Sequence, residues 1–157
     1  MHAGLGLYLT PRSALGQAWG NYLSGLARWD WWVTLTFRDP PPDPRTPGWT
    51  RPGWAWAKKG WREAKGRLPG PALGEPWWVR GFEIQHWRGA PHIHALVGGL
   101  ASRRYAEFGT WWWEAYGLCK VEEYDPGKGA GFYLCKYVTK ALADIEFGGL
   151  TQGKTLM

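Results

Sequence analysis

The chain has 157 residues, enough for one domain with a substantial core. Its 45% hydrophobic content excludes a disordered chain, and no run approaches the ~20 apolar residues that a membrane helix needs. The 19 lysines and arginines outnumber the 13 acidic residues, giving a net charge of +6, and the 14 tryptophans are more than one small core easily buries. A basic surface with exposed rings is typical of proteins that bind single-stranded nucleic acid.

The first half of the chain predicts two helices that flank a strand and a loop. Apolar residues recur at helical offsets over 12–28, and residues 29–37 are rich in β-branched and aromatic side chains. Residues 39–53 contain six prolines and are expected to form a surface loop. Residues 54–67 favour a helix. The strand should place one set of side chains on each face: Trp31, Val33, Leu35 and Phe37 on one, and Trp32, Thr34 and Thr36 on the other.

The second half predicts a hairpin, a helix, a strand and a final helix. The hairpin strands are expected at 77–85 and 91–98, joined by a short link that contains glycine. A helix at 102–116 should carry Trp112 and Trp113 into the core, and a strand should follow at 118–124. A final helix is expected at 129–145, and residues 148–157 should be loose. With no internal repeat or domain boundary, we predict a single α+β domain over residues 1–157, with helices covering a central antiparallel sheet.

The compartment is predicted from the cysteines and from the start of the chain. Residues 1–10 lack the charged region and long apolar run of a signal peptide. Cys119 and Cys135 form no CxxC motif and are expected to be reduced core residues. We therefore expect a cytoplasmic protein that does not associate with membranes.

Two histidines and a carboxylate form a candidate metal site. Period two in the strand 91–98 puts His92 and His94 on one face, and Glu83 and Gln85 share one face of the preceding strand. If Gln85 pairs with His92, Glu83 lies opposite His94 and the three ligands meet. Two imidazoles and a carboxylate with open positions suit Mn²⁺ or Mg²⁺. Gln85 and His86 are alternatives to Glu83 as the third ligand.

The final helix carries a candidate nucleophile. Tyr133, Lys136, Tyr137 and Lys140 are separated by three, four and seven residues, so they form one stripe on a helix. A tyrosine hydroxyl is a poor nucleophile because its pKa is near 10. A metal that polarises a phosphate and a lysine one turn away would make it competent. The alternative is an amphipathic helix whose lysines extend to solvent.

Three motifs follow one another in order: the apolar-threonine strand 33–37, Pro91-His92-Ile93-His94, and the doubled tyrosine-x-x-lysine pattern over 133–140. Together they resemble the HUH endonuclease superfamily, specifically the two-tyrosine rolling-circle replication initiators (Rep proteins) of small plasmids and single-stranded DNA phages. The resemblance spans roughly residues 30–142. It implies the HUH/Rep nuclease fold, with an antiparallel sheet of about five strands. No P-loop pattern is present, so the helicase domain of larger members is not expected.

The resemblance also implies an activity and a set of site residues. His92 and His94 match the paired metal ligands, Glu83 the upstream ligand, and Tyr133 and Tyr137 the paired nucleophiles. The implied reaction is nicking and joining of single-stranded DNA at a replication origin through a 5′-phosphotyrosine, with the single-stranded or hairpin origin, a host helicase and a polymerase as partners. The protein itself is expected to be a monomer or a weak oligomer. The candidate DNA-binding residues are Thr34, Thr36, Arg38, Lys58, Arg62, His86 and Arg88.

Other functions fit parts of the same sequence. A single-tyrosine HUH transposase or a small relaxase would use the same chemistry. A non-catalytic single-strand-binding module would use the tryptophans alone. A structural zinc protein would use His92, His94 and the cysteines. The basic side of the helix at 54–67, formed by Lys58, Lys59, Arg62 and Lys65, fits a solvated helix as well as a DNA contact.

Overall fold

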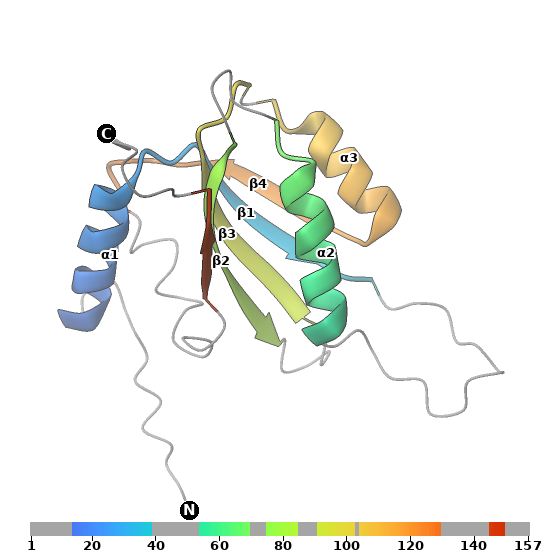
Figure 1. Ribbon diagram of the computed structural model, residues 1–157, viewed down its shortest axis with the longest axis horizontal. Coiled ribbons are helices and arrows are strands. Elements are labelled where there is room, and N and C mark those ends of the chain that lie inside the picture. The colour runs from blue at the N-terminus through green and yellow to red at the C-terminus, as the bar shows by residue number, and fades with distance from the viewer. Residues whose placement is uncertain are drawn as a thin grey trace, which may run out of the picture.

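The computed structural model of the protein describes residues 14–38, 54–69, 75–84, 91–102, 104–129 and 145–149. These ranges hold three helices and five strands, which confirms the predicted α+β class (Figure 1). The helices are α1 (Ala14–Leu26), α2 (Trp54–Gly66) and α3 (Ala106–Ala115). The strands are β1 (Trp31–Thr36), β2 (Trp77–Ile84), β3 (Pro91–Gly98), β4 (Cys119–Glu123) and β5 (Glu146–Gly148).

All five strands form one antiparallel sheet in the order β4-β1-β3-β2-β5. This confirms the expected sheet of about five strands. The central strand is β3, which pairs with β1 on one side and with β2 on the other. Any side chain on β3 therefore has neighbours from two strands, so residues on three adjacent strands can converge on one point of a face.

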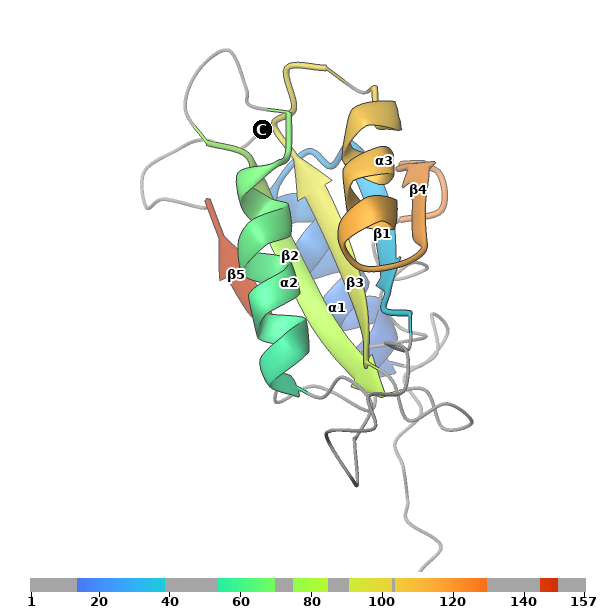
Figure 2. The same ribbon diagram turned by 90° about the vertical axis from the view of Figure 1, so that its right-hand side faces the viewer.

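Helices cover both faces of the sheet, as Figures 1 and 2 show. Helices α2 and α3 lie on one face, and α1 lies on the other. The alternation predicted for β1 is confirmed, because its two sets of residues enter two different clusters. Trp31, Val33, Leu35 and Phe37 are buried against α2 and α3, whereas Trp32 is buried with Leu23 of α1. We call these two sides of the sheet the α2/α3 face and the α1 face.

Helix α2 packs closely against Phe37 at a glycine on its inner side. Ala57, Gly60 and Ala64 are buried on its inner side, together with Trp61. A Cβ atom added at Gly60 would lie 2.8 Å from Cζ of Phe37, which is closer than carbon atoms pack. A larger residue at this point of the helix would force the ring of Phe37 to shift.

Helix α3 contributes one of the two tryptophans that were expected in the core. Trp112 is fully buried, and its indole N–H donates to the carbonyl of Thr36 at 3.0 Å. Trp113 is 55% exposed, so its predicted burial is wrong. Phe108 and Trp112 are four residues apart and share the inward side of α3, whereas the next residue is rotated by about 100°. Trp113 instead stacks against Arg38, whose Cζ lies 5.1 Å from the ring centroid.

The edge strand β5 was not predicted, and the expectation of loose chain from residue 148 is wrong for Gly148. This three-residue strand pairs with β2 through Val79 and Phe147. It is too short for an alternating pattern to reveal it, and it forms because the edge of β2 offers backbone groups that need partners. An ion pair between Arg80 and Glu146 also joins the two strands.

The predictions for the loop 39–53, for the link 85–90 and for most of the final helix (residues 130–144) lie outside the described residues. The described helices are 10 to 13 residues long. None of these three combines the length and the apolar character that crossing a bilayer requires.

Candidate metal centre

Glu83, His92 and His94 come together on the two strands at the middle of the sheet. We call these three residues the metal triad. His92 and His94 alternate along β3, and Glu83 lies directly opposite His92 on β2. Leu96 follows His92 and His94 on the same side of β3, and it packs in the cluster under α1. The triad therefore lies on the α1 face.

The predicted hairpin register is wrong by two residues. Gln85 was expected opposite His92 and Glu83 opposite His94, but β2 pairs Glu83 with His92 and Gly81 with His94. The sequence does not determine how many residues the turn takes up, and the paired segment ends at Ile84 and Pro91. A shift of two residues leaves each side chain on its original face, so the three ligands still meet.

The spacing of the triad fits one divalent cation. One ligand atom from each residue lies within 4.8 Å of the other two. Nε2 of His94 and Oε2 of Glu83 are 3.2 Å apart. Adjacent ligands in an octahedral shell of about 2.1 Å radius are about 3.0 Å apart, and opposite ones about 4.2 Å. Side-chain adjustments of less than 1 Å would therefore place all three on a common ion.

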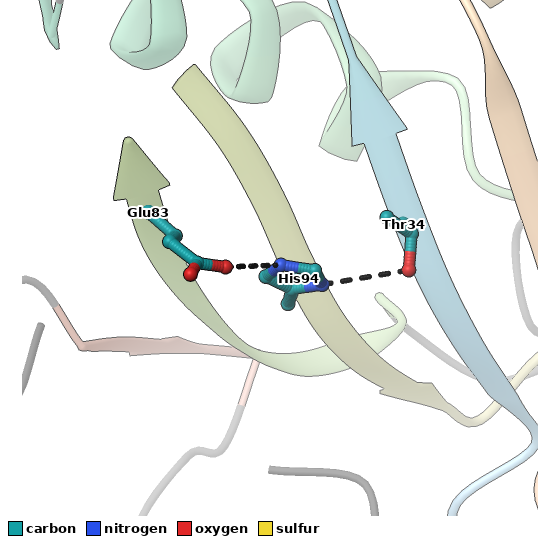
Figure 3. Close-up of polar contacts among 3 residues, drawn as sticks. All are labelled: Thr34, Glu83 and His94. Atoms are coloured by element: carbon teal, nitrogen blue, oxygen red, sulfur yellow. Dashed lines mark hydrogen bonds and ion pairs between the residues drawn. The ribbon is translucent and has the colours of Figure 1, made fainter. Parts of the chain in front are cut away.

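His94 is held from three sides. Its ring lies between Glu83 and Thr34, with Nδ1 at 3.4 Å from the Thr34 hydroxyl (Figure 3). The indole of Trp32 stacks on the imidazole, with 5.7 Å between ring centroids and 10° between the planes. With its proton on Nδ1, the neutral ring donates to Thr34 and leaves the Nε2 lone pair facing the triad. Because a hydroxyl can accept this bond, Thr34 is compatible with the tautomer that binds a metal, and it helps to hold the ring in place.

Burial lowers the pKa of His94 below its ordinary value of 6.5. The side chain is 2% exposed, and removal from water disfavours the charged imidazolium. The hydrogen bond and the charge of Glu83 act in the opposite direction but are the smaller effects. His94 is therefore neutral at neutral pH, which is the form that can ligate a cation.

The two threonines predicted to bind DNA have different surroundings. The Thr34 hydroxyl faces His94. Thr36 lies opposite His92 in the pairing of β1 with β3, but its hydroxyl accepts the Leu118 N–H at 3.1 Å and donates to the Leu118 carbonyl at 3.2 Å. The Thr36 hydroxyl thus joins the end of β1 to the start of β4, and only Thr34 reaches the triad.

Three of the predicted DNA-binding residues are not brought to the triad. Lys58 and Arg62 are exposed on α2, which covers the opposite face of the sheet. Arg38 is exposed beside Trp113 of α3. Several other predicted residues lie outside the described ranges: the alternative ligands Gln85 and His86, the DNA-binding candidate Arg88, and the tyrosine stripe of Tyr133, Lys136, Tyr137 and Lys140.

Cys119 does not belong to the site. It packs against the cluster on the α2/α3 face, and the metal-ligand cluster found among the described residues contains the triad alone. Burial raises the pKa of its thiol to about 12, so the thiolate that zinc would bind is disfavoured. Within the described part of the chain, the geometry therefore does not support a zinc site that uses this cysteine.

Sequence reasoning named Thr34 only as a DNA-binding candidate and missed the contacts that Thr34 and Trp32 of β1 make with His94. Trp32 and Thr34 share a face of β1 by simple alternation, which the sequence revealed. Their contact with His94 depends on β1 lying next to β3, with Thr34 paired to His94. These strands are separated by more than 50 residues of chain, and no local pattern reports that pairing.

Comparison of the chain with protein-family models, with curated proteins and with solved structures found no match. Its function is therefore argued from the triad and its surroundings.

Proposed function

We propose that the chain is a metal-dependent endonuclease of the HUH type, which nicks and rejoins single-stranded DNA through a tyrosine nucleophile. The observation that carries the proposal is the meeting of Glu83, His92 and His94 on the two central strands of a five-stranded antiparallel sheet. In this proposal the protein acts at a replication origin to start rolling-circle replication, and a host helicase and polymerase act after it.

The donor set favours a catalytic cation over a structural one. Mn²⁺ and Mg²⁺ prefer about six ligands, so three protein ligands leave positions for substrate oxygens. A structural zinc site has four protein ligands, whereas the described residues supply three. The ion, when bound, would polarise a non-bridging oxygen of the scissile phosphate. The chain's own contribution is to hold His94 neutral and oriented between Thr34 and Glu83.

The described residues on either side of the tyrosine stripe lie on the same face as the triad. Tyr124, which follows β4, and Ile145, which precedes β5, both pack against the cluster under α1. Gly129 is close to Ser24 of α1. Strands β4 and β5 are the opposite edges of the sheet. The segment that contains Tyr133 and Tyr137 therefore leaves and rejoins the described fold on the triad's face, which supports their assignment as nucleophiles.

The proposed reaction is a transesterification that needs no ATP. The phenolic oxygen of Tyr133 or Tyr137 bonds to phosphorus while the bond from phosphorus to the 3′ oxygen breaks. The phenolic proton is lost to solvent, and the leaving oxygen takes up a proton to become a free 3′-hydroxyl. Lys136 and Lys140 would stabilise the developing negative charge. The 5′-phosphotyrosine conserves the bond energy, so the second tyrosine can repeat the exchange and rejoin strands.

The proposal is tested with the whole chain and a single-stranded DNA library that has a randomised centre and a fluorophore at its 3′ end. In Mn²⁺ the fluorescent strand should become attached to protein and survive SDS. The variant carrying both Tyr133→Phe and Tyr137→Phe should lose the adduct, as should His92→Ala and any sample in EDTA. Tyr105→Phe is the matched control, because Tyr105 is an exposed tyrosine of the described fold and should leave the adduct unchanged.

Two outcomes would overturn the proposal. Retention of the adduct by the double tyrosine variant would show that neither Tyr133 nor Tyr137 is the nucleophile. DNA binding that persists in EDTA with no adduct from any tyrosine would favour a non-catalytic single-strand-binding module.

A further inference from the structure

We propose that α2 carries a second nucleic-acid site, which binds the phosphate backbone of duplex DNA and works without the metal triad. The site is the stripe formed by Lys58, Arg62 and Lys65, called the basic stripe below. It is separated from the triad by the sheet itself, as Figures 1 and 2 show for α2. The proposal does not depend on the nicking reaction.

The charge of the chain is concentrated on this helix. Lys58, Lys59, Arg62, Lys65 and Arg67 are all exposed on α2 or directly after it. The same segment has one carboxylate, Glu63, which accepts a hydrogen bond from the buried Tyr116. Five cations and one carboxylate give this segment, α2 together with Arg67, a charge of +4, compared with +6 for the whole chain. Such a concentration attracts polyanions at long range.

The basic stripe runs along one side of α2. Its residues are separated by four and three positions, so they project from one side of α2 over about 10 Å of its axis. Within the described ranges, none of the three forms an ion pair, although Lys65 lies 5.5 Å from the centroid of the Trp78 ring. Three cations along one line, none of them in an ion pair within the described residues, are suited to the phosphates of a nucleic acid, which has one charge per about 1.7 Å of duplex axis.

The chemistry of the stripe favours a duplex backbone over single-stranded bases. Single-strand sites combine cations with exposed aromatic rings on which bases stack. Trp61 is the aromatic residue of α2 that is closest in sequence to the stripe, but its side chain is 3% exposed and faces the sheet. The stripe thus offers charge without a stacking surface. An anionic membrane is also less favoured, because the apolar side of α2 is packed on the sheet and cannot enter lipid.

The position of the stripe gives it a role distinct from that of the triad. A single DNA strand bound at the triad would lie on the α1 face and could not reach Lys58 or Arg62 through the β-sheet. A duplex that flanks such a strand can pass the β5 edge and lie along α2. The two sites would then hold the single-stranded and double-stranded parts of one DNA molecule.

The test measures duplex binding by the whole chain in EDTA, with a fluorescent 20-base-pair duplex of arbitrary sequence and a single strand of the same length. The variant Lys58→Ala/Arg62→Ala/Lys65→Ala should bind the duplex at least about tenfold more weakly at low salt, and its plot of log affinity against log salt should lose a slope of about 3. The control Arg104→Ala/Lys120→Ala/Lys128→Ala removes the same charge from other exposed positions and should weaken binding less than about threefold.

The possible results separate this site from the proposed nuclease. Equal losses in the two triple variants would show a general charge effect and overturn the proposal. Loss of single-strand binding alone, or binding of phosphatidylserine vesicles in place of duplex, would overturn it as well. The adduct assay reports on the nuclease separately, since the basic-stripe variant retains every residue of the triad and both tyrosines.

Discussion

The two faces of the sheet are made by the same strands but differ in the size of their apolar clusters and in the polar residues that they carry. On the α2/α3 face, two helices bury a continuous cluster of large side chains, including Trp31, Phe37 and Trp112. On the α1 face, the cluster under a single helix is smaller, and it adjoins the polar triad. Adjacent residues of β1 face opposite sides: Val33 is buried in the core, and the Thr34 hydroxyl contacts His94 of the triad. Strand alternation therefore lets one sheet place its larger core on one face and the candidate metal centre on the other.

The strongest test of this separation removes a core ring from the α2/α3 face. Trp112→Ala should lower the free energy of unfolding by about 3–5 kcal/mol, because the buried ring and its hydrogen bond to Thr36 are both lost. Trp113→Ala is the matched control: its ring is 55% exposed, so the change should be below about 1 kcal/mol. Urea unfolding followed by circular dichroism measures both.

The same variants show whether the faces are independent. The affinity of folded Trp112→Ala for Mn²⁺, measured by electron paramagnetic resonance in the cold, should match that of the unmodified chain. A loss of more than about tenfold, or 1.4 kcal/mol, would mean that packing on the α2/α3 face determines the geometry of the triad.

Much of this two-sided arrangement was predictable because alternation is local. The residues of β1 and β3 that face the α2/α3 side could be assigned from period two alone, as could the shared face of His92, His94 and Glu83. The α+β class followed from the order of helical and strand patterns. Within each of these strands the alternation extends over only six to eight residues, so it is visible in the local sequence.

The features that were wrong or missed depend on how segments of the chain are placed against one another. The register of Glu83 against His92 depends on the length of the hairpin turn, and the contact of Thr34 with His94 depends on the pairing of β1 with β3. β5 exists because the edge of β2 is available to it. Trp113 could not be distinguished from Trp112 by composition, because the direction of each ring depends on how α3 is rotated against the sheet. None of these determinants is visible in the pattern of a single helix or strand.

A finer test of the α1 face alters the support of a ligand and leaves the ligand itself in place. Thr34→Val keeps the shape of the side chain but removes the hydroxyl beside Nδ1 of His94. Mn²⁺ affinity should fall about tenfold, the usual effect of losing a partner that orients a metal-bound histidine. Thr34→Ser should restore it, since serine keeps the hydroxyl.

The neighbouring threonine supplies the contrast. Thr36→Val removes two hydrogen bonds to the backbone of Leu118, so it should lower stability by about 1–2 kcal/mol without changing the Mn²⁺ affinity of the folded protein. Equal effects of Thr34→Val and Thr36→Val on affinity would show that Thr34 has no specific link to His94.

The smallest expected effect is the pH dependence that the buried His94 imposes on the metal-free protein. Its pKa is lowered in the folded state, chiefly by burial, while that of the unfolded chain remains about 6.5. Above pH 6.5 both states are neutral at this position and it adds no pH dependence. Below pH 6.5 the unfolded chain binds a proton that the folded chain resists. Stability should then fall with decreasing pH, with a limiting slope of about 1.4 kcal/mol per pH unit.

Urea unfolding in EDTA at pH 7.5 and at pH 5.5 measures this loss. The variant His94→Asn should show a smaller difference between the two pH values, because its amide does not titrate. Glu83 faces the ring and partly counteracts the effect of burial, so Glu83→Gln should enlarge the loss at pH 5.5. Metal-free stability that is as sensitive to pH in His94→Asn as in the unmodified chain would mean that another group causes the loss. The neutral His94 of the α1 face would then have no measurable consequence for folding.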